Sequence, residues 1–332
     1  MKAIVLHGIN EPLILQEVET PQAGKGEVVV KIKATSFNRR DWWIQKGQYA
    51  GLKFPIILGS DGSGIVEETG EGVDNNWKGK EVVIYPCFNW GNDERFQSKN
   101  FSIVGLPENG TFAEYIKIPV VNLFPKPTHL SFEEAATLPV AGVTAFRALF
   151  FKGQLHPSDK VLITGIGGGA AVFALQWALS AGAEVYVTSG SEEKINKAID
   201  IGAKAGVNYK DKNWHEQLKS KAGSFDIIID SSLGDGFAKF IEIASPGARI
   251  VFYGGTAGNI PVLNGRSVFW KQITILGTTC GSSKDFAGML SFVEQHEIHP
   301  VIDAIYPFEQ AEEAMCEMNA GSRKFGKVVL SW

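Results

Sequence analysis

The chain has 332 residues, of which 44% are hydrophobic and 20% are charged, and its formal net charge is −4. This length and apolar content allow two ordinary domains with buried cores, which excludes a disordered polyanion. The mild net acidity and the lack of a basic stripe argue against a nucleic-acid partner.

The N-terminal residues and the cysteines favour a cytoplasmic protein. The opening Met-Lys-Ala-Ile-Val-Leu-His-Gly lacks the apolar core and the cleavage site of a signal peptide. No stretch approaches the ~18–20 apolar residues that cross a bilayer, so we expect no membrane partner. Cys87, Cys280 and Cys316 are too few and too far apart for a disulfide framework, and we expect all three as small buried residues.

The first part of the chain, up to about residue 125, predicts an antiparallel, barrel-like β domain. Short β-branched runs, typical of strands, alternate there with clusters of Gly, Pro, Asn and Asp. The expected strands are Ala3–Leu6, Glu27–Ala34, Gly64–Glu67 and Glu81–Tyr85.

From Ser131 onward the pattern changes to alternating helices and strands, which predicts a doubly wound parallel sheet and an α/β fold class. Ser131 and Glu134 have capping-box spacing, so a helix should begin there, and a second should span Gly142–Phe151. The expected strands are Lys160–Thr164, Glu184–Thr188, Asp226–Asp230, Ala248–Tyr253 and Ile273–Gly277. The expected helices are Ala170–Ala181, Glu192–Gly202, Trp214–Ala222, Phe237–Ala244 and Ser283–Glu297, and a last strand is Lys327–Leu330.

A glycine-rich turn follows the strand at Lys160–Thr164 and precedes a helical pattern. This is the context in which a dinucleotide pyrophosphate meets backbone N–H groups and the positive end of a helix. The register stays open, because Gly165-x-Gly167-x-x-Ala170 fits directly while Gly168, Gly169 and Ala171 fit a pattern shifted by one. The expected cofactor contacts here are Gly167, Gly168, Gly169 and Ala170.

The end of the next strand favours NADP(H) over NAD(H). An NAD site has an acidic residue here that accepts a hydrogen bond from the ribose 2′-hydroxyl, but this chain has Ser189. A carboxylate would repel a 2′-phosphate, whereas Ser189, Ser191 and Lys194 can hydrogen-bond to it. The alternative is that Lys194 lies on a solvated helix face.

Several motifs along the chain together resemble the medium-chain dehydrogenase/reductases, in particular their zinc-less, quinone-oxidoreductase-like branch. The resemblance implies a GroES-like catalytic domain of residues 1–126 and 298–332, with a Rossmann domain of residues 127–297 between them. The motifs are Ser36–Asp41, Leu58–Gly64, Gly110–Tyr115, Leu130–Leu138, the glycine turn and Gly326–Leu330.

The same resemblance implies that both zinc sites of the zinc-dependent relatives are lost, so we expect no metal. Asn38 stands where those relatives have a catalytic cysteine, and Ser60 stands where they have a histidine. The segment that corresponds to their four-cysteine lobe keeps only Cys87, and we expect Trp90 and Phe96 to plug it. His296-x-x-His299 lacks a third ligand nearby in sequence, and we interpret both histidines as surface residues.

Zinc-less relatives reduce quinones or activated double bonds, so the resemblance implies an NADPH-dependent reductase of quinones or α,β-unsaturated carbonyls. Asn38, Trp43 and Tyr49 are its candidate catalytic residues, with the Asn38 amide facing a cleft and Tyr49 as a possible proton donor. Water or the cofactor ribose is the alternative donor. The resemblance gives Asp41 a loop-stabilising role, and the sequence does not decide whether Arg39 and Arg40 are solvated or meet a cofactor phosphate.

The same motifs imply further cofactor contacts. The implied contacts are Thr144, Tyr209, Ser231, Tyr253, Gly254, Thr278 and Lys327.

The expected partners are a small-molecule substrate and a second copy of the chain, with a homodimer formed through pairing of the Gln272–Gly277 strand. Two alternative functions stay open: an alcohol dehydrogenase with improvised metal ligands, and a non-catalytic NADPH-binding protein.

Overall fold

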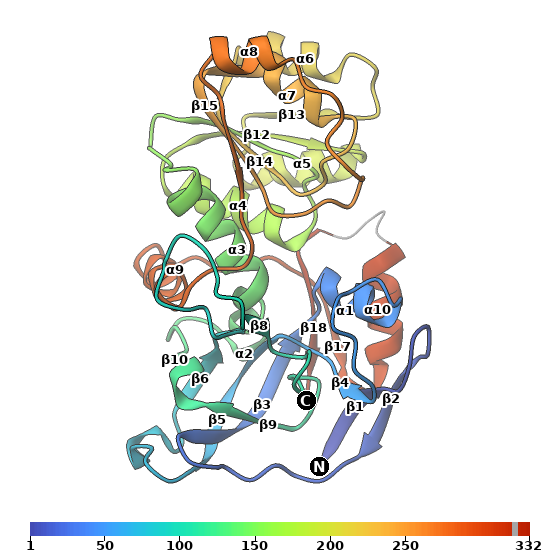
Figure 1. Cartoon of the computed structure of the whole chain (residues 1–332), viewed down its shortest axis with the longest axis vertical. Coiled ribbons are helices and arrows are strands. Elements are labelled where there is room, and N and C mark those ends of the chain that lie inside the picture. The colour runs from blue at the N-terminus through green and yellow to red at the C-terminus, as the bar shows by residue number, and fades with distance from the viewer. Residues whose placement is uncertain (321–324) are drawn as a thin grey trace. The chain divides into compact units, whose positions relative to one another are not determined.

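Both ends of the chain contribute to the same compact unit (Figure 1). The computed structural model describes residues 1–320 and 325–332. The first unit contains Met1–Ala141, residues 281–320 and Lys327–Trp332, and the second contains Gly142–Cys280 and residues 325–326. Residues 127–141 and 281–297 thus pack with the first unit, and the family domain boundaries expected from the sequence stay a prediction.

The first unit is built around a sheet of seven strands among the described residues, in the order β10-β6-β5-β3-β18-β17, with β9 paired to β3. Strand β18 runs antiparallel to β3, with Leu330 opposite Thr35, so the end of the chain completes a sheet begun near its start. The strands of residues 1–125 pair antiparallel, which confirms the expectation for this part of the chain. The β17–β18 pair, from the C-terminal part of the chain, is parallel.

The strands of the first unit form two further small sheets, β2-β1-β4 and β7-β8. The bounds of the strands are β1 (Lys2–Leu6), β2 (Leu13–Glu17), β3 (Glu27–Ser36), β4 (Ile56–Ile57), β5 (Asp61–Thr69), β6 (Glu81–Ile84), β7 (Cys87–Phe88), β8 (Ser102–Ile103), β9 (Tyr115–Pro119), β10 (Leu123–Pro125), β17 (Ile302–Pro307) and β18 (Lys327–Ser331). Its helices are α1 (Arg39–Gln45), α2 (Phe132–Ala135), α9 (Ser283–Gln295) and α10 (Ala311–Ala320).

Helix α2 begins where the capping box predicts. Ser131 Oγ accepts a hydrogen bond from the backbone N–H of Glu134 at 3.1 Å, and a Glu134 carboxylate oxygen accepts one from the Ser131 N–H at 2.9 Å. The two bonds satisfy N–H groups that would otherwise lack partners in the first turn. Residues buried between α2 and the sheet include Ala34, Ala136 and Val329.

The second unit contains a six-stranded parallel sheet among its described residues, in the order β13-β12-β11-β14-β15-β16. The chain starts in the middle at β11, proceeds outward to β13 and then crosses to β14. The strand order therefore changes direction between β11 and β14, and open parallel sheets bind ligands beyond the carboxyl ends of the strands at such a point. The strands are β11 (Lys160–Ile163), β12 (Glu184–Ser189), β13 (Ala205–Asn208), β14 (Phe225–Asp230), β15 (Ala244–Phe252) and β16 (Thr274–Gly277).

The helices of the second unit form two packed groups, α3 with α4 and α5, and α6 with α7 and α8. Right-handed crossovers place these groups on opposite faces of the sheet. The expected helix Gly142–Phe151 is only partly α-helical, because α3 lies between the π-helical turns Leu138–Gly142 and Arg147–Lys152. The helices are α3 (Val143–Phe146), α4 (Gly169–Ser180), α5 (Glu192–Ile201), α6 (Trp214–Ala222), α7 (Phe237–Ile243) and α8 (Gly265–Trp270).

Two sequence expectations about burial are wrong. Cys87 and Cys280 are buried as expected, but Cys316 is exposed on α10. Trp90 is buried and packs edge-on against Phe101, whereas Phe96 is 56% exposed and therefore plugs nothing.

No helix in the described parts of the chain has both the length and the apolar character needed to cross a membrane.

Candidate active site

Asn38 caps helix α1 and is fixed through its backbone. Its N–H donates to Asp41 Oδ2 at 2.7 Å, and its carbonyl oxygen accepts from the Asp41 N–H at 3.0 Å. The Asp41 carboxylate therefore stabilises the start of the helix, which confirms the loop-stabilising role expected for it. Asp41 is fully buried, and this desolvation raises the pKa of its carboxyl to about 6 against the opposing influence of Arg40.

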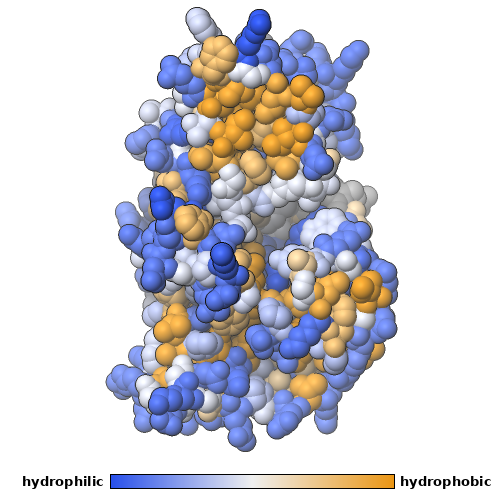
Figure 2. All heavy atoms as spheres, in the orientation of Figure 1, coloured by the Kyte–Doolittle hydropathy of each residue, from blue (hydrophilic) through white to orange (hydrophobic). Residues whose placement is uncertain are grey.

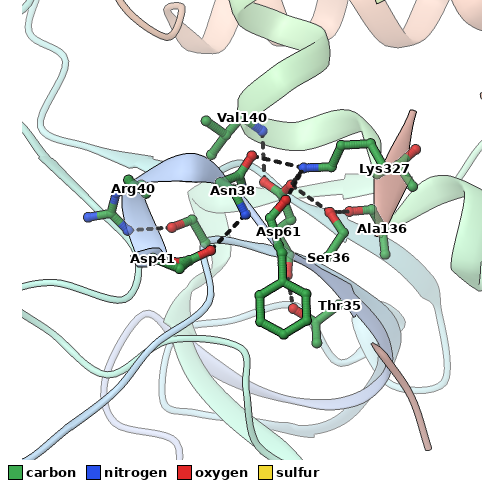
Figure 3. Close-up of polar contacts among 12 residues, drawn as sticks. Thr35, Ser36, Asn38, Arg40, Asp41, Asp61, Ala136, Val140 and Lys327 are labelled. Atoms are coloured by element: carbon green, nitrogen blue, oxygen red, sulfur yellow. Dashed lines mark hydrogen bonds and ion pairs between the residues drawn. The ribbon is translucent and has the colours of Figure 1, made fainter. Parts of the chain in front are cut away.

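A buried ion pair lies beside Asn38 (Figure 3). The Lys327 ammonium donates to Asp61 Oδ2 at 3.0 Å, to Asn38 Oδ1 at 2.8 Å and to the Phe37 carbonyl oxygen at 2.6 Å. Asp61 is in turn held by Ser36 Oγ at 2.7 Å and by the backbone N–H of Val140 at 2.8 Å. The pair is thus enclosed by groups from β3, β5, β18 and the segment after α2.

Arg40, the second residue of α1, directs its guanidinium into the same unit. Its Nη1 donates to Ser60 Oγ and, at 2.8 Å, to the carbonyl oxygen of Val104. Its Nε lies 3.5 Å from the Tyr49 hydroxyl oxygen, and the guanidinium carbon lies 5.1 Å from the centre of the Tyr49 ring. Arg40 Nη2 is buried and has no hydrogen-bond partner among the described residues.

The residues that the resemblance places at the zinc-ligand positions do not suit a divalent cation. The side-chain oxygen of Asn38 already accepts from an ammonium group, and that of Ser60 accepts from a guanidinium. A zinc ion bound to either oxygen would lie close to a fixed positive charge, and neutral amide and hydroxyl oxygens are poor zinc ligands. In the described parts of the chain, no three His, Cys, Asp or Glu side chains are grouped to hold a metal.

The other two candidate catalytic residues are both half-buried. The Tyr49 oxygen accepts from Arg40, which leaves its own O–H to donate elsewhere. Trp43 lies on α1, where its neighbour Trp42 packs against the apolar core of the unit. The Trp43 carbonyl oxygen accepts from the Gln48 N–H at 2.8 Å, and the catalytic role of the side chain stays a prediction.

The glycine-rich turn in the second unit joins β11 to α4, as the sequence predicts. Gly165 and Gly167 have φ angles of 62° and 120°, a region in which other residues are strained. The backbone N–H of Ile166 donates to the Thr188 carbonyl oxygen at 2.8 Å, which ties the turn to the neighbouring strand.

Gly168 precedes α4 and has open space beside it. A Cβ atom built on Gly168 would meet nothing within 4 Å, and its φ of −74° suits any residue. The fold itself therefore does not require glycine at this position, so a close ligand is the physical reason to expect one. The open backbone at the start of a helix is the arrangement that receives a dinucleotide pyrophosphate.

Ser189, Ser191 and Tyr209 come together at the carboxyl ends of β12 and β13. The Tyr209 N–H donates to the Ser189 carbonyl oxygen at 3.1 Å, and the Ser191 N–H donates to Ser189 Oγ at 3.3 Å. Gly190, between the two serines in sequence, passes close to the Tyr209 side chain. A Cβ atom at Gly190 would approach the Tyr209 hydroxyl oxygen to 2.8 Å. Lys194 is on the first turn of α5, next to this group in sequence.

The remaining predicted contacts lie mainly at the ends of β14, β15 and β16. Gly254 passes so close to β14 that a Cβ would come within 2.5 Å of the Ser231 carbonyl oxygen. Burial raises the pKa of Tyr253, and Ser231 is hydrogen-bonded to its hydroxyl. Thr278 Oγ1 is buried without a hydrogen-bond partner among the described residues, while Thr144 lies on α3 away from these strand ends in sequence.

The sequence did not predict the roles of Arg40 and Asp61, and it predicted a different set of contacts for Lys327 from the one in the structure. It left Arg40 undecided and gave no role to Asp61, although charged residues inside apolar motifs were a usable signal. Lys327 was expected at the cofactor, but all three of its N–H bonds point to acceptors within the first unit. Its contact with the cofactor stays a prediction.

The two units match two family models. The model described as "Alcohol dehydrogenase GroES-like domain" matches residues 24–128, and the one described as "Zinc-binding dehydrogenase" matches residues 169–295. A crystal structure of an NAD-dependent alcohol dehydrogenase superposes with a TM-score of 0.93 at 36% identity, over 100% of both chains.

Curated relatives cover 95% or more of the chain and differ in the activities that their names state. A zinc-type alcohol dehydrogenase-like protein of Schizosaccharomyces pombe is 38% identical over 95% of this chain and 94% of its own. A quinone oxidoreductase of Mus musculus is 29% identical over 99% and 97%, respectively. An acryloyl-coenzyme A reductase of Metallosphaera sedula is 29% identical over 100% of both.

Proposed function

Because the chain belongs to the zinc-type alcohol dehydrogenase-like family of medium-chain dehydrogenase/reductases and is an NAD(P)H-dependent oxidoreductase, we propose that it reduces quinones or α,β-unsaturated carbonyls without zinc. One observation carries the proposal: cationic donors face the side-chain oxygens at both expected zinc-ligand positions. Lys327 donates to Asn38, and Arg40 donates to Ser60. The relatives named quinone oxidoreductase and acryloyl-coenzyme A reductase support this class of substrate.

The chemistry needs hydrogen-bond donors rather than a metal. NADPH, when bound, supplies a hydride to the carbon that is conjugated to the substrate carbonyl. The carbon–carbon π electrons then shift toward the carbonyl carbon, and the carbonyl π pair moves onto its oxygen, giving an enolate or a phenolate. Donors placed at that oxygen lower the barrier, and a proton completes the product.

Three donors of the first unit are available for this oxygen. Asn38 Nδ2 and Arg40 Nη2 are buried without partners among the described residues, and the Tyr49 hydroxyl can still donate. Arg40 adds a fixed positive charge where the zinc relatives have a metal. The Tyr49 hydroxyl is the candidate for the final proton, and water is the alternative.

The cofactor we propose is NADP(H). Strand β12 ends in Ser189 rather than in a carboxylate, and the cluster of Ser189, Ser191 and Tyr209 offers hydroxyl groups that can hydrogen-bond to a 2′-phosphate. Gly167, Gly168, Gly169 and Ala170 would take the pyrophosphate at the start of α4. The ends of β14, β15 and β16 would take the nicotinamide half through Ser231, Tyr253, Gly254 and Thr278, with Thr144 from α3.

A homodimer through β16 is part of the proposal. Strand β16 is at the edge of the six-stranded sheet and pairs only with β15 among the described residues. The second unit carries a patch of apolar side chains on the face drawn in Figure 2, and its exposed apolar residues include Val262, Phe269 and Trp270. A strand with one unpaired edge and exposed aromatic residues nearby favours pairing with a second copy of the chain.

The experiment that tests the proposal follows NADPH oxidation against quinones, enones and aldehydes, with NADH in parallel and the zinc content of the purified protein measured. We expect turnover of quinones or enones with less than about 0.1 equivalent of zinc and no effect of a chelator. About one equivalent of zinc and loss of activity to the chelator would favour an alcohol dehydrogenase. Tight NADPH binding without turnover would favour a non-catalytic protein.

A further inference from the structure

The Asn38 side chain has only one of its polar atoms satisfied. Its Oδ1 accepts from Lys327 Nζ at 2.8 Å, while Nδ2 is buried and has no partner among the described residues. The residue is 8% exposed. A buried donor left without a partner costs about 1–3 kcal/mol, so a fold that keeps one needs a reason.

Lys327 fixes which end of the amide is left open. An ammonium group has three N–H donors and no acceptor, so only the amide oxygen can face it favourably. If the amide rotated by half a turn, its own N–H groups would point at the ammonium. The orientation of the Asn38 amide therefore follows from the chemistry of its neighbour rather than from a choice between similar atoms.

The ammonium itself cannot readily move. Its three donors are all used, by Phe37 O, Asn38 Oδ1 and Asp61 Oδ2, and its side chain is 4% exposed. Asp61, which is fully buried, is anchored by Ser36 Oγ and the Val140 N–H (Figure 3). A chain of contacts thus runs from the sheet through Asp61 and Lys327 to the amide of Asn38.

We propose that Lys327, held by Asp61, is a positioning residue that presents the Nδ2–H of Asn38 to the substrate oxygen on which negative charge develops. The inference rests on the proposed function and extends it by giving a role to a lysine expected at the cofactor. Lys327 acts through Asn38 and donates no proton. The hydride, the electron pair on oxygen and the final proton follow the course described above.

The test removes the orientation without leaving a buried charge unpaired. In the double variant K327M/D61N both charges are lost together, which avoids the large penalty of an unpaired buried ion. We expect kcat for enone or quinone reduction to fall about 10- to 100-fold. This decrease is no larger than the one caused by removing a whole oxyanion donor. KM should change by less than about threefold, and K327R should recover most of kcat, because a guanidinium also only donates.

A second comparison separates positioning from a structural role. N38A removes the amide, and N38A combined with K327M/D61N should have the same kcat as N38A alone, because the pair acts only through Asn38. The matched control is R249M/D159N, which removes a largely buried ion pair of 3.1 Å in the second unit and should leave kcat unchanged. Urea unfolding of every variant identifies those that no longer fold.

Several outcomes would overturn the inference. Losses that multiply in the combined variant would show that Lys327 and Asn38 act independently. An unchanged kcat in K327M/D61N, in a protein that unfolds as cooperatively as the wild type, would show that the amide needs no positioning. Failure of the wild-type protein to reduce any quinone or enone would instead reject the proposed function, and it is recognised before any variant is made.

Discussion

The carboxyl group of Asp41 lies fully buried, with Oδ2 bonded to the Asn38 N–H and Oδ1 without a partner among the described residues. Desolvation raises its pKa to about 6 from an ordinary value near 4. Between these two pH values the folded protein keeps a proton that the unfolded chain has lost. The free energy of unfolding should therefore fall as pH rises through this window and stay level above it.

The substitution D41N tests this dependence, since asparagine keeps an oxygen that can accept from the Asn38 N–H and cannot ionise. We expect the stability of the wild type relative to D41N to decrease between pH 4 and pH 6, by on the order of 3 kcal/mol. Urea unfolding at pH 4, 5, 6 and 7 measures the difference. A difference that is constant or grows with pH would show that Asp41 is ionised throughout.

The second prediction at this scale concerns the 2′-phosphate of the cofactor. The double variant S189D/K194A places a carboxylate next to the expected phosphate and removes a cation, so kcat/KM for NADPH relative to NADH should fall about 10- to 100-fold. The ratio of the two kcat/KM values is the measurement. K197A is the matched control, because Lys197 lies on the same helix and pairs with Glu193 at 2.9 Å. An unchanged ratio in S189D/K194A would reject the phosphate contact.

At the scale of single elements, two glycines of the second unit separate a glycine needed by a ligand from one needed by the fold: Gly168 before α4 and Gly254 after β15. A Cβ on Gly168 meets no protein atom within 4 Å, whereas a Cβ on Gly254 comes within 2.5 Å of a backbone oxygen. G168A should therefore leave the unfolding temperature unchanged and weaken NADPH binding by about tenfold or more.

G254A is the contrasting variant, and it should lower the unfolding temperature of the cofactor-free protein because the backbone of Ser231 must move. Calorimetric titration with NADPH and thermal unfolding without it measure the two effects. If G168A bound NADPH as tightly as the wild type, the open space beside Gly168 would not be the pyrophosphate site.

Element boundaries were predictable where short-range signals set them. The glycine turn, the Ser131 capping box and helix α6 follow from residues within a few positions of one another. Strand β13 was missed, because Ala205–Asn208 contains Gly206 and has little β-branched character; a Cβ on Gly206 would come within 2.5 Å of the Ile195 side chain. The π-helical turns around α3 were also missed, since no local pattern distinguishes them from an α-helix.

At the scale of the whole molecule, the proposed dimer gives a test that does not depend on activity. Sedimentation should yield about twice the 36.1 kDa of one chain for the wild type. F269E/W270E places two carboxylates on the exposed aromatic positions beside the edge strand and should yield one chain. V121E, at an apolar position that is 75% exposed in the first unit, should leave the dimer intact. A monomeric wild type, or a dimeric F269E/W270E, would contradict pairing through β16.

The sequence alone determined the α/β fold class and the glycine turn between β11 and α4, because periodicity, caps and glycine spacing act over a few residues and survive in the linear pattern. Its motifs together carried the resemblance to the family that the relatives show. It also identified Asn38 and Ser60 as unsuitable zinc ligands. Only the tertiary structure decided what faces them: Lys327 reaches Asn38 across 289 positions, and Arg40 reaches Ser60 across 20. Such contacts depend on how strands from the two ends of the chain pack side by side, and nothing local in the sequence records which buried donor meets which acceptor.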